Sequence, residues 1–465
     1  MTLIKSISGI RGTIGGTPGD SLTPIDVVKF SAAYGQWMKS KARANKVVIG
    51  RDARPSGKMV SKLVANTLIG LGIDVVDIGL STTPTVEMAV QMVQAGGGII
   101  ITASHNPIQW NALKLLNHKG EFISADDGQE ILKIADDERH NFSTVEEIGN
   151  YEIASGFIEK HIEEILTHKL INTEAIRKVG FRIAIDCVNS TGGIAVPKLL
   201  KALGVNHVVE LNCEPNGLFT HNPEPLPENL TEISALLADG GLDLGIAVDP
   251  DVDRLALICE DGTPFGEEYT LVAVSDYVLG KIPGNTVSNL SSTRALREIT
   301  ENHGGTYFAS AVGEVNVVEK MKEVNAVIGG EGNGGVIYPE LHYGRDALMG
   351  IALFLSHLAD SGMKVSELRA TYPEYYISKN KIALGPELDI DLILSEMKIL
   401  FADQKTNTID GLKIEFEKSN EWIHLRQSNT EPIIRIYSES KSKESAQQLS
   451  KTAIEKINEI VATKV

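Results

Sequence analysis

The sequence predicts an α/β protein of several domains, and three observations lead to this prediction. The chain has 465 residues, whereas one hydrophobic core rarely organises more than about 250–300 residues. Hydrophobic residues make up 42% and charged residues 23% of the chain, as in ordinary globular proteins. Short β-branched segments alternate with segments of helical spacing along most of the chain, a pattern typical of sheets covered by helices. We therefore expect three or four domains.

The alternation of predicted strands and helices begins in the first part of the chain. Apolar, β-branched residues predict buried strands at 46–50, 73–78 and 98–102. Helical spacing predicts helices at 60–71 and 84–94. The order of strands and helices favours a largely parallel sheet with helices on both faces.

The same alternation recurs twice, and the C-terminal stretch departs from it. Further strands are predicted at 182–186, 244–248, 286–290 and 326–329. The C-terminal stretch has three predicted strands, at 411–416, 422–425 and 433–438, and then a helix from about Ser442. Apolar residues at every fourth position predict one buried stripe on that helix: Leu449, Ala453, Ile457 and Val461.

These stretches divide the chain into four predicted domains. We place them at 1–150, 151–258, 259–372 and 373–465. The first three are expected to be similar α/β domains with mixed sheets, and the fourth a smaller α+β domain.

Charge and cysteine content narrow the class of protein. The formal net charge of −17 disfavours nucleic-acid binding, which usually needs a basic surface. The three cysteines, Cys187, Cys213 and Cys259, are too few for a disulfide scaffold and fit a reducing compartment. The sequence contains neither a signal-peptide core nor an apolar run of about 20 residues. We expect a cytoplasmic protein that binds neither nucleic acid nor membrane.

Three polar loops follow directly on predicted strands. They are the serine loop at 102–107 (Thr-Ala-Ser-His-Asn-Pro), the aspartate loop at 249–254 (Asp-Pro-Asp-Val-Asp-Arg) and the glycine loop at 330–335 (Gly-Glu-Gly-Asn-Gly-Gly). Ligands of open α/β sheets bind at the carboxyl ends of strands. The three loops therefore suggest one shared site.

The aspartate loop is a candidate metal site. Asp249, Asp251 and Asp253 lie within five residues, and each pair of carboxylates at ~5 Å repels by roughly 3 kcal/mol at an effective dielectric of ~20. Oxygen ligands favour Mg²⁺ or Ca²⁺. An EF-hand would use Glu260 as its twelfth residue but needs Gly where Arg254 stands. We therefore favour magnesium, with a solvated acidic turn as the alternative.

Ser104 in the serine loop is a candidate phosphoryl carrier. An ordinary Ser/Asn turn would also fit, because Asn106 and Pro107 close the loop. A Ser-His hydrolase is disfavoured, since Ser104 and His105 are adjacent and no G-x-S-x-G elbow is present. A phosphorylated Ser104 would supply an oxygen to the magnesium.

The glycine loop and a fourth loop suggest substrate binding. The glycine loop matches G-x-G-x-x-G, but Glu331 and a following Val-Ile-Tyr-Pro disfavour a dinucleotide site. Glu331 and Asn333 instead resemble a clamp for sugar hydroxyls, with a plain glycine turn as the alternative. The C-terminal loop at 426–432 (Arg-Gln-Ser-Asn-Thr-Glu-Pro), with Arg435, offers donors for a phosphate. A solvated hairpin is its alternative.

The four loops in this order resemble those of the α-D-phosphohexomutase superfamily over essentially the whole chain. Two N-terminal segments, 8–12 (Ser-Gly-Ile-Arg-Gly) and 50–57 (Gly-Arg-Asp-Ala-Arg-Pro-Ser-Gly), also resemble motifs of that family. The resemblance implies four domains around a central cleft. The glycine loop of this chain looks most similar to that of phosphoglucosamine mutases of the archaeal type, which grade into phosphomannomutases.

The resemblance also implies roles for single residues. Ser104 would carry the phosphoryl group, and Arg11, His105 and Lys114 would complete the catalytic set. Ser104 and the three aspartates would hold one Mg²⁺. The remaining residues would bind substrate: Arg254, Glu331, Asn333, Arg426, Ser428, Asn429, Thr430 and Arg435. Glu314 and Gly335 stand where some relatives have His, so the general acid/base stays open.

The implied reaction interconverts a hexose 6-phosphate and a hexose 1-phosphate through phosphoserine and a hexose 1,6-bisphosphate. Glucosamine phosphate is the first choice of substrate, and mannose or glucose phosphate the second. A metal-dependent phosphatase and a non-catalytic sugar-phosphate sensor are the alternatives from other classes. We expect a monomer or a homodimer.

Overall fold

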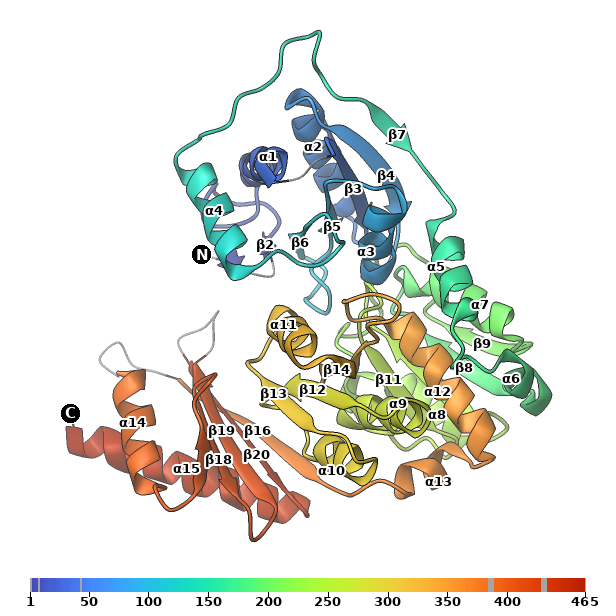
Figure 1. The fold of residues 1–465 in the computed structure, drawn as a ribbon, viewed down its shortest axis with the longest axis vertical. Helices are drawn as coiled ribbons and strands as arrows, with labels where there is room; N and C mark the ends of the chain where they lie inside the picture. Colours follow the sequence, from blue (N-terminus) through green and yellow to red (C-terminus); the bar gives the residue numbers. More distant parts are fainter. Residues whose placement is uncertain (1, 7–8, 42–43, 384–388, 428–432, 465) are drawn as a thin grey trace. The chain divides into compact units, whose positions relative to one another are not determined.

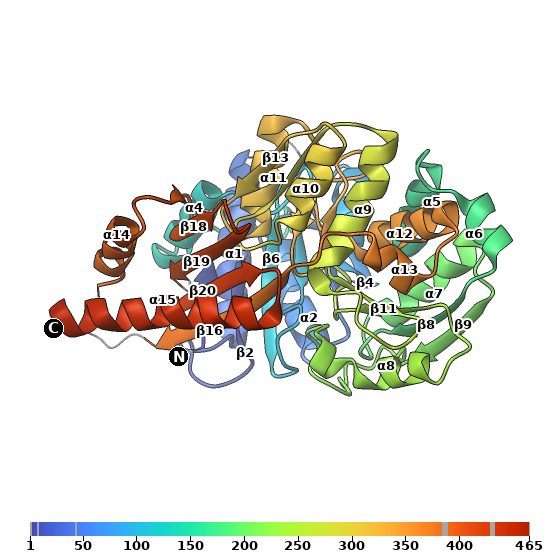
Figure 2. The same ribbon diagram turned by 90° about the horizontal axis from the view of Figure 1, so that it is seen from below.

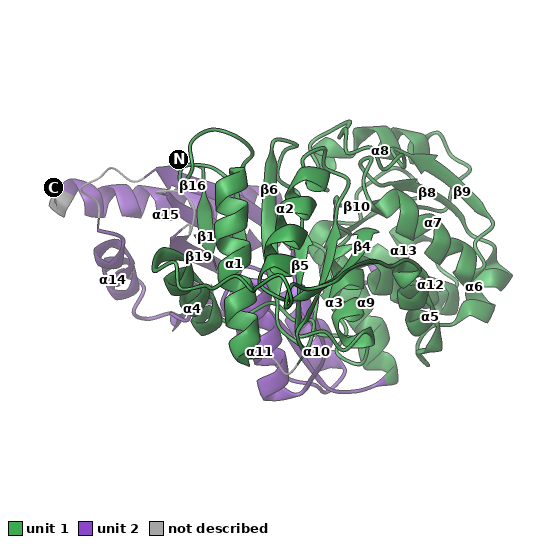
Figure 3. Cartoon of the chain, turned by 90° about the horizontal axis from the view of Figure 1, so that it is seen from above, with its two compact units in different colours: residues 1–281, 333–369 green, residues 282–332, 370–465 purple. Residues whose placement is uncertain are grey.

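The protein is described by a computed structural model that covers all residues except 1, 7–8, 42–43, 384–388, 428–432 and 465. The chain forms two compact units, each built from two segments (Figure 3). Unit 1 comprises 1–281 and 333–369, and unit 2 comprises 282–332 and 370–465.

A seven-stranded sheet forms the first part of unit 1, in the order β1-β2-β6-β5-β3-β4-β7. Its strands are β1 (Ile4–Ser6), β2 (Gly9–Thr13), β3 (Lys46–Arg51), β4 (Asp74–Leu80), β5 (Gly97–Ile101), β6 (Trp110–Leu116) and β7 (Tyr151–Ile153). Its helices are α1 (Pro24–Lys41), α2 (Gly57–Gly70), α3 (Thr83–Met92) and α4 (Ala125–Asp136).

Helices cover both faces of this sheet because the residues of its central strands alternate between two cores (Figure 1). Val47 and Ile49 of β3 pack on the side of α1 and α2, whereas Val48 packs on the side of α3. The sheet is mixed: β3 is parallel to β4 and β5, while β5 and β6 are antiparallel. The expectation of a largely parallel sheet therefore holds for its central strands, and β6, β2 and β1 form an antiparallel edge.

A four-stranded sheet, β11-β10-β8-β9, forms the second part of unit 1. Its strands are β8 (Arg182–Asp186), β9 (His207–Leu211), β10 (Leu244–Val248) and β11 (Leu255–Cys259). The helices of this stretch are α5 (Phe157–Thr167), α6 (Thr173–Val179), α7 (Gly192–Leu203), the 3₁₀ turn η1 (Pro227–Asn229) and α8 (Thr231–Ala238). Unit 1 also contains α9 (Glu267–Lys281), β15 (Gly335–Ile337) and the buried helix α12 (Ala347–Ser361); α13 spans Val365–Ala370.

Unit 2 contains two further sheets. The first has the strands β12 (Asn285–Asn289), β13 (Tyr307–Ser310) and β14 (Ala326–Glu331), with the helices α10 (Ala295–Asn302) and α11 (Glu314–Val324). The second has the order β16-β20-β19-β18-β17. Its elements are β16 (Tyr376–Ala383), α14 (Ile390–Leu400), β17 (Lys405–Asn407), β18 (Leu412–Phe416), β19 (Glu421–Gln427), β20 (Ile433–Ser440) and α15 (Lys443–Lys464).

The closing helix packs as its sequence predicts. In Figure 2, α15 runs alongside β16 and β20 of its own sheet. Ala453 and Ile457 are fully buried in the core of this sheet, and Leu449 and Val461 pack against it. The strands predicted at 182–186 and 244–248 coincide with β8 and β10. Among the described residues, no helix combines the length and apolar character needed to cross a bilayer.

Candidate active site

The serine loop leaves the buried strand β5 in a constrained conformation. Ser104 has a φ of 49°, a left-handed conformation that is uncommon for residues other than glycine. Thr102 stabilises it, because its Oγ1 accepts a hydrogen bond from the Ser104 amide at 2.9 Å. The same hydroxyl donates to Asp52 Oδ2 at 2.7 Å. Ser104 thus lies in a hydrogen-bonded loop with its side chain buried.

Arg54 holds the serine loop in place through hydrogen bonds to its backbone. Its guanidinium donates to the backbone oxygens of the loop and its continuation: Ser104, Asn106, Pro107 and Trp110. Its Nε also donates to Asp52 Oδ2 at 2.9 Å. The planar group of an arginine suits such a set of simultaneous bonds. Arg54 therefore positions the backbone that carries Ser104.

The aspartate loop joins two antiparallel strands, β10 and β11. Val252 in its middle has a φ of 63°, a strained conformation for a β-branched residue. Asp249 Oδ1 closes the loop by accepting the amides of Asp253 and Arg254, each at 3.1 Å. Strands flank the loop on both sides, and Glu260 accepts bonds from Ser366 instead. The structure therefore excludes the EF-hand alternative.

The two loops meet inside unit 1. Ser104 Oγ donates a hydrogen bond to Asp249 Oδ2 at 2.7 Å. Thr83, at the start of α3, bonds to Asp251 twice, from its amide to the backbone oxygen at 2.8 Å and from its Oγ1 to Oδ2 at 2.5 Å. The structure thus brings the serine and the aspartates into one buried site.

Two cations neutralise part of the carboxylate charge. Lys114 Nζ lies 2.7 Å from Asp251 Oδ2 and 3.2 Å from Asp253 Oδ2. Arg345 Nη2 donates to Asp253 Oδ2 at 2.7 Å. Lys114 and Arg345 thus pair with two of the three aspartates, Asp251 and Asp253.

The donor set fits a divalent cation. One oxygen from each of the three aspartates lies within 4.8 Å of the other two. Asp251 Oδ1 and Asp253 Oδ1 are buried and have no hydrogen-bond partner among the described residues. Buried carboxylate oxygens without a partner are costly, and a hard cation such as Mg²⁺ would satisfy them.

The charges of the site shift the pKa values of its groups. Burial and the repulsion of Asp253 and Asp251 raise the pKa of Asp249 well above its ordinary value. Burial opposes ionisation of Asp253 too, but Arg345, Lys114 and Arg254 outweigh it and hold that pKa well below its usual range. Burial lowers the pKa of Lys114, but Asp251 and Asp253 outweigh this effect and raise it. Lys114 is therefore a permanent cation.

Three further predicted residues lie around this centre. Arg11 Nη1 donates to Asn106 Oδ1 at 2.9 Å. His105 Nδ1 lies 3.3 Å from Ser104 Oγ, and burial together with Arg254 and Arg11 lowers its pKa well below the ordinary value. His105 is therefore a neutral imidazole. Arg254 pairs with Glu224 at 3.2 Å.

Two of the three predicted sugar-binding residues, Glu331 and Asn333, belong to different units. Glu331 is in unit 2, where its Oε1 accepts bonds from Asn289 Nδ2 at 3.0 Å and from the Gly313 amide at 3.2 Å. Asn333 is in unit 1, and its Oδ1 accepts the Gly335 amide at 3.2 Å. β15 follows the loop instead of a helix, which excludes a dinucleotide-binding motif.

The C-terminal loop is described at its edges. Arg426 and Arg435 are register partners in β19 and β20, and Arg426 Nε lies 3.3 Å from Asp410 Oδ2. The remaining predicted phosphate-binding residues lie outside the described part of the chain: Ser428, Asn429 and Thr430.

Three residues that hold this site are not among the site residues that the sequence predicts. Arg54 lies in the N-terminal motif at 50–57 without a predicted role of its own, and no predicted motif includes Thr83 or Arg345. Arg345 directly precedes Asp346, whose Oδ1 caps the N-terminus of α12. A polar Gly-Arg-Asp segment before a very apolar helix was the available signal.

Profiles of known protein families match four successive parts of the chain. Four family profiles match it, described as phosphoglucomutase/phosphomannomutase α/β/α domains I, II and III and C-terminal domain. They match residues 3–142, 159–262, 266–376 and 387–456, respectively.

Relatives that match over nearly their whole length are named as enzymes of the same family. The chain is 35% identical over 458 residues to a phosphoglucomutase/phosphomannomutase of Thermococcus kodakarensis, covering 96% of this chain and 98% of the relative. It is 32% identical over 451 residues to a phosphoglucosamine/phosphogalactosamine mutase of Sulfurisphaera tokodaii, covering 95% and 96%.

Solved structures share the fold. A phosphoglucomutase/phosphomannomutase family protein from Burkholderia thailandensis superposes with a TM-score of 0.85 at 27% identity, covering 99% of this chain and 98% of that one. A putative phosphomannomutase from Thermus thermophilus superposes with a TM-score of 0.82 at 25% identity, covering 99% of each chain. The protein therefore belongs to the α-D-phosphohexomutase superfamily, as an isomerase of the phosphoglucomutase/phosphomannomutase family.

Proposed function

We propose that the protein interconverts glucosamine 6-phosphate and glucosamine 1-phosphate, with Ser104 as the phosphoryl carrier. The observation that carries this proposal is the 2.7 Å hydrogen bond from Ser104 Oγ to Asp249 Oδ2. It joins a strained serine to a group of aspartates capable of holding a cation. The names of several archaeal relatives support glucosamine phosphate as the substrate, while mannose or glucose phosphate is the alternative.

The reaction would proceed in two transfers. In the first, the P–Oγ bond of phosphorylated Ser104 breaks, and a P–O bond forms to the free hydroxyl of the hexose monophosphate. The proton of that hydroxyl passes, in sum, to Ser104 Oγ. The resulting hexose 1,6-bisphosphate turns around, and its other phosphoryl group returns to Ser104.

The residues around Ser104 would divide this work. Lys114 and Arg11 would bind oxygens of the transferring group, because cations stabilise its spread charge. His105, neutral and 3.3 Å from Ser104 Oγ, is the candidate for moving the proton. Bound Mg²⁺, held by Asp249, Asp251, Asp253 and the phosphoserine, would supply charge neutralisation at the phosphoryl group.

The other predicted residues would bind the non-reacting parts of the substrate. Glu331 and Asn333 would bind sugar hydroxyls, together with Arg254. The phosphate that does not react would be bound by the C-terminal loop and its neighbours: Arg426, Ser428, Asn429, Thr430 and Arg435. A cytoplasmic location, a monomeric or homodimeric state and the domain boundaries at 150, 258 and 372 remain predictions from the sequence.

Intact-mass analysis tests the carrier. Native protein and Ser104→Ala are incubated with glucose 1,6-bisphosphate and with glucosamine 1,6-bisphosphate. We expect a gain of one phosphoryl group in the native protein alone. Equal labelling of both proteins would refute the role of Ser104.

Coupled assays with glucosamine, mannose and glucose phosphates then test the substrate. We expect the highest kcat/KM with glucosamine phosphate. Release of inorganic phosphate in step with substrate loss would indicate a phosphatase instead.

A further inference from the structure

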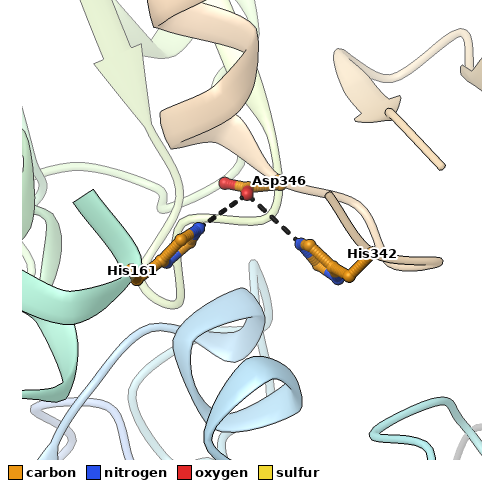
Figure 4. A group of neighbouring side chains, drawn as sticks. All are labelled: His161, His342 and Asp346. Atoms are coloured by element: carbon orange, nitrogen blue, oxygen red, sulfur yellow. Dashed lines mark hydrogen bonds and ion pairs between the residues drawn. The ribbon is translucent and has the colours of Figure 1, made fainter. Parts of the chain in front are cut away.

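A second buried cluster of metal-ligating side chains lies in unit 1, apart from the aspartate loop. His161 comes from α5, His342 from the segment before α12, and Asp346 from the N-cap of α12. Both imidazole rings point at the carboxylate of Asp346 (Figure 4). All three side chains are buried. Segments far apart in the sequence thus meet at one carboxylate.

We propose that His161, His342 and Asp346 form a binding site for a divalent transition-metal ion of the zinc class. Asp346 Oδ2 lies 2.9 Å from His161 Nε2 and 3.2 Å from His342 Nε2. One ligand atom from each of the three lies within 4.8 Å of the others. Zinc bonds to imidazole nitrogen and carboxylate oxygen are about 2.0–2.2 Å, which places tetrahedral ligands about 3.3 Å apart. Two of the three ligand spacings are thus close to the tetrahedral value, and the ion would displace the protons that now join the histidines to Asp346.

The groups that contact the second nitrogen of each histidine and the second oxygen of Asp346 support the assignment of a zinc site. The other ring nitrogen of His161 lies 2.9 Å from Thr85 Oγ1, and that of His342 lies 3.2 Å from Glu87 Oε2. Asp346 Oδ1 accepts two amides of α12, at 2.9 and 3.2 Å. Metal-binding histidines typically contact a carboxylate, a backbone carbonyl or a water through their second nitrogen, which orients the ring. His342 has the Glu87 carboxylate in this position at ion-pair distance, and His161 has the Thr85 hydroxyl.

Glycine at position 344 makes room for this arrangement. A Cβ built on Gly344 would lie 1.8 Å from Glu87 Oε2 and 2.9 Å from His342 Cε1. Any larger residue would displace the carboxylate behind His342. The local backbone therefore accommodates the cluster.

The ligand types select the ion. Two imidazoles and one carboxylate suit Zn²⁺, whereas Mg²⁺ prefers oxygen ligands alone. The aspartate loop offers only oxygen ligands, so it should bind Mg²⁺ while the histidine cluster binds Zn²⁺. Because Arg345 precedes Asp346 and donates to Asp253 at 2.7 Å, an ion here would also fix the start of α12 beside the aspartate loop.

Metal binding to the full-length protein tests the proposal without measuring activity. Chelator-treated protein in excess Mg²⁺, which fills the aspartate loop, is titrated with Co²⁺ and then Zn²⁺. We expect the intense visible absorption of four- or five-coordinate Co²⁺, removed stoichiometrically by one Zn²⁺ per chain. Six oxygen ligands would give only weak absorption.

Matched variants assign the ligands. His161→Asn and His342→Asn should each weaken Zn²⁺ affinity at least about 100-fold, and Glu87→Gln about 10–100-fold. His118→Asn, at an exposed position, and Asp249→Asn should both retain the Co²⁺ absorption. If a variant does not fold, the spectrum of the native protein still decides.

Two results would overturn the proposal. One is native protein that takes up no Co²⁺ or Zn²⁺ in excess Mg²⁺, and the other is unchanged Zn²⁺ affinity in both folded histidine variants. The cluster would then be an ion-paired network, in which His342 is protonated between Glu87 and Asp346.

Discussion

Ser104 Oγ donates to Asp249 Oδ2 across 2.7 Å, although the two residues are 145 positions apart in the sequence. Both come from loops with a left-handed residue, Ser104 itself and Val252. Such conformations cost about 1–3 kcal/mol each and are concentrated at functional sites. The fold therefore maintains this contact against local strain, as expected if Ser104 is the proposed phosphoryl carrier.

Lys114→Met should destabilise the protein and strengthen its response to Mg²⁺. The lysine is buried between Asp251 and Asp253, and removing one partner of a buried ion pair costs about 3–5 kcal/mol. Bound Mg²⁺ replaces the lost charge, so the rise in melting temperature on adding Mg²⁺ should exceed that of the native protein. Phosphoryl transfer should slow by about 10²–10³-fold. Lys119→Met, at an exposed position, is the control, and an equal Mg²⁺ response in both would contradict this account.

Arg54→Lys should impair catalysis more than substrate binding. Lysine cannot bond at once to the oxygens of Ser104, Asn106, Pro107 and Trp110 as the guanidinium does. Misplacing the serine loop by about 1 Å should lower kcat by roughly 100-fold, with a much smaller change in KM. Steady-state kinetics measure this, with the exposed Arg139→Lys as control. A change confined to KM would show that Arg54 acts elsewhere.

Gly334→Ala should destabilise the protein far more than Gly362→Ala. Both glycines have positive φ, 81° and 66°, so both substitutions carry the cost of a left-handed alanine. A Cβ at Gly334 would also lie 2.2 Å from the Leu255 carbonyl oxygen, whereas nothing lies within 4 Å at Gly362. We expect a difference of about 2 kcal/mol or more in the free energy of unfolding, from denaturant titration. Equal losses would mean that the loop relaxes without cost.

Unit 2 should lose stability as the pH falls from about 6.5 to 4. Burial, opposed in part by the bond to the Asp410 carbonyl oxygen, lowers the pKa of His424 to about 4. The unfolded chain, with an ordinary histidine pKa of about 6.5, binds more protons in this range, so protonation favours unfolding. The full effect is roughly 3 kcal/mol at the acid end and is absent above pH 6.5.

Hydrogen exchange of peptides from β18 to β20, corrected for intrinsic pH dependence, measures this change in unit 2. His424→Gln should remove the part of the pH dependence that belongs to this residue. The exposed His118→Gln should leave it unchanged. A native-like pH profile in His424→Gln would assign the effect to another group.

The chain's sequence determined its element types and the location of its polar loops, because both follow from local patterns. The strand β10 is a continuous apolar run, β8 has an apolar centre between Arg182 and Asp186, and the stripe of α15 recurs at every fourth residue. The order of the strands within the sheets could not be predicted from local sequence patterns. The antiparallel edge formed by β6, β2 and β1 depends on pairings that no local period encodes.

Tertiary structure alone decided which side chains meet. The aspartates could be found as a motif because they lie within five residues, whereas Thr83, Arg345 and the cluster around Asp346 join segments distant in the chain. Their contacts exist only after the strands and helices of unit 1 pack together. Sequence spacing fixes neighbours along one element, and the burial of the common core fixes neighbours between elements.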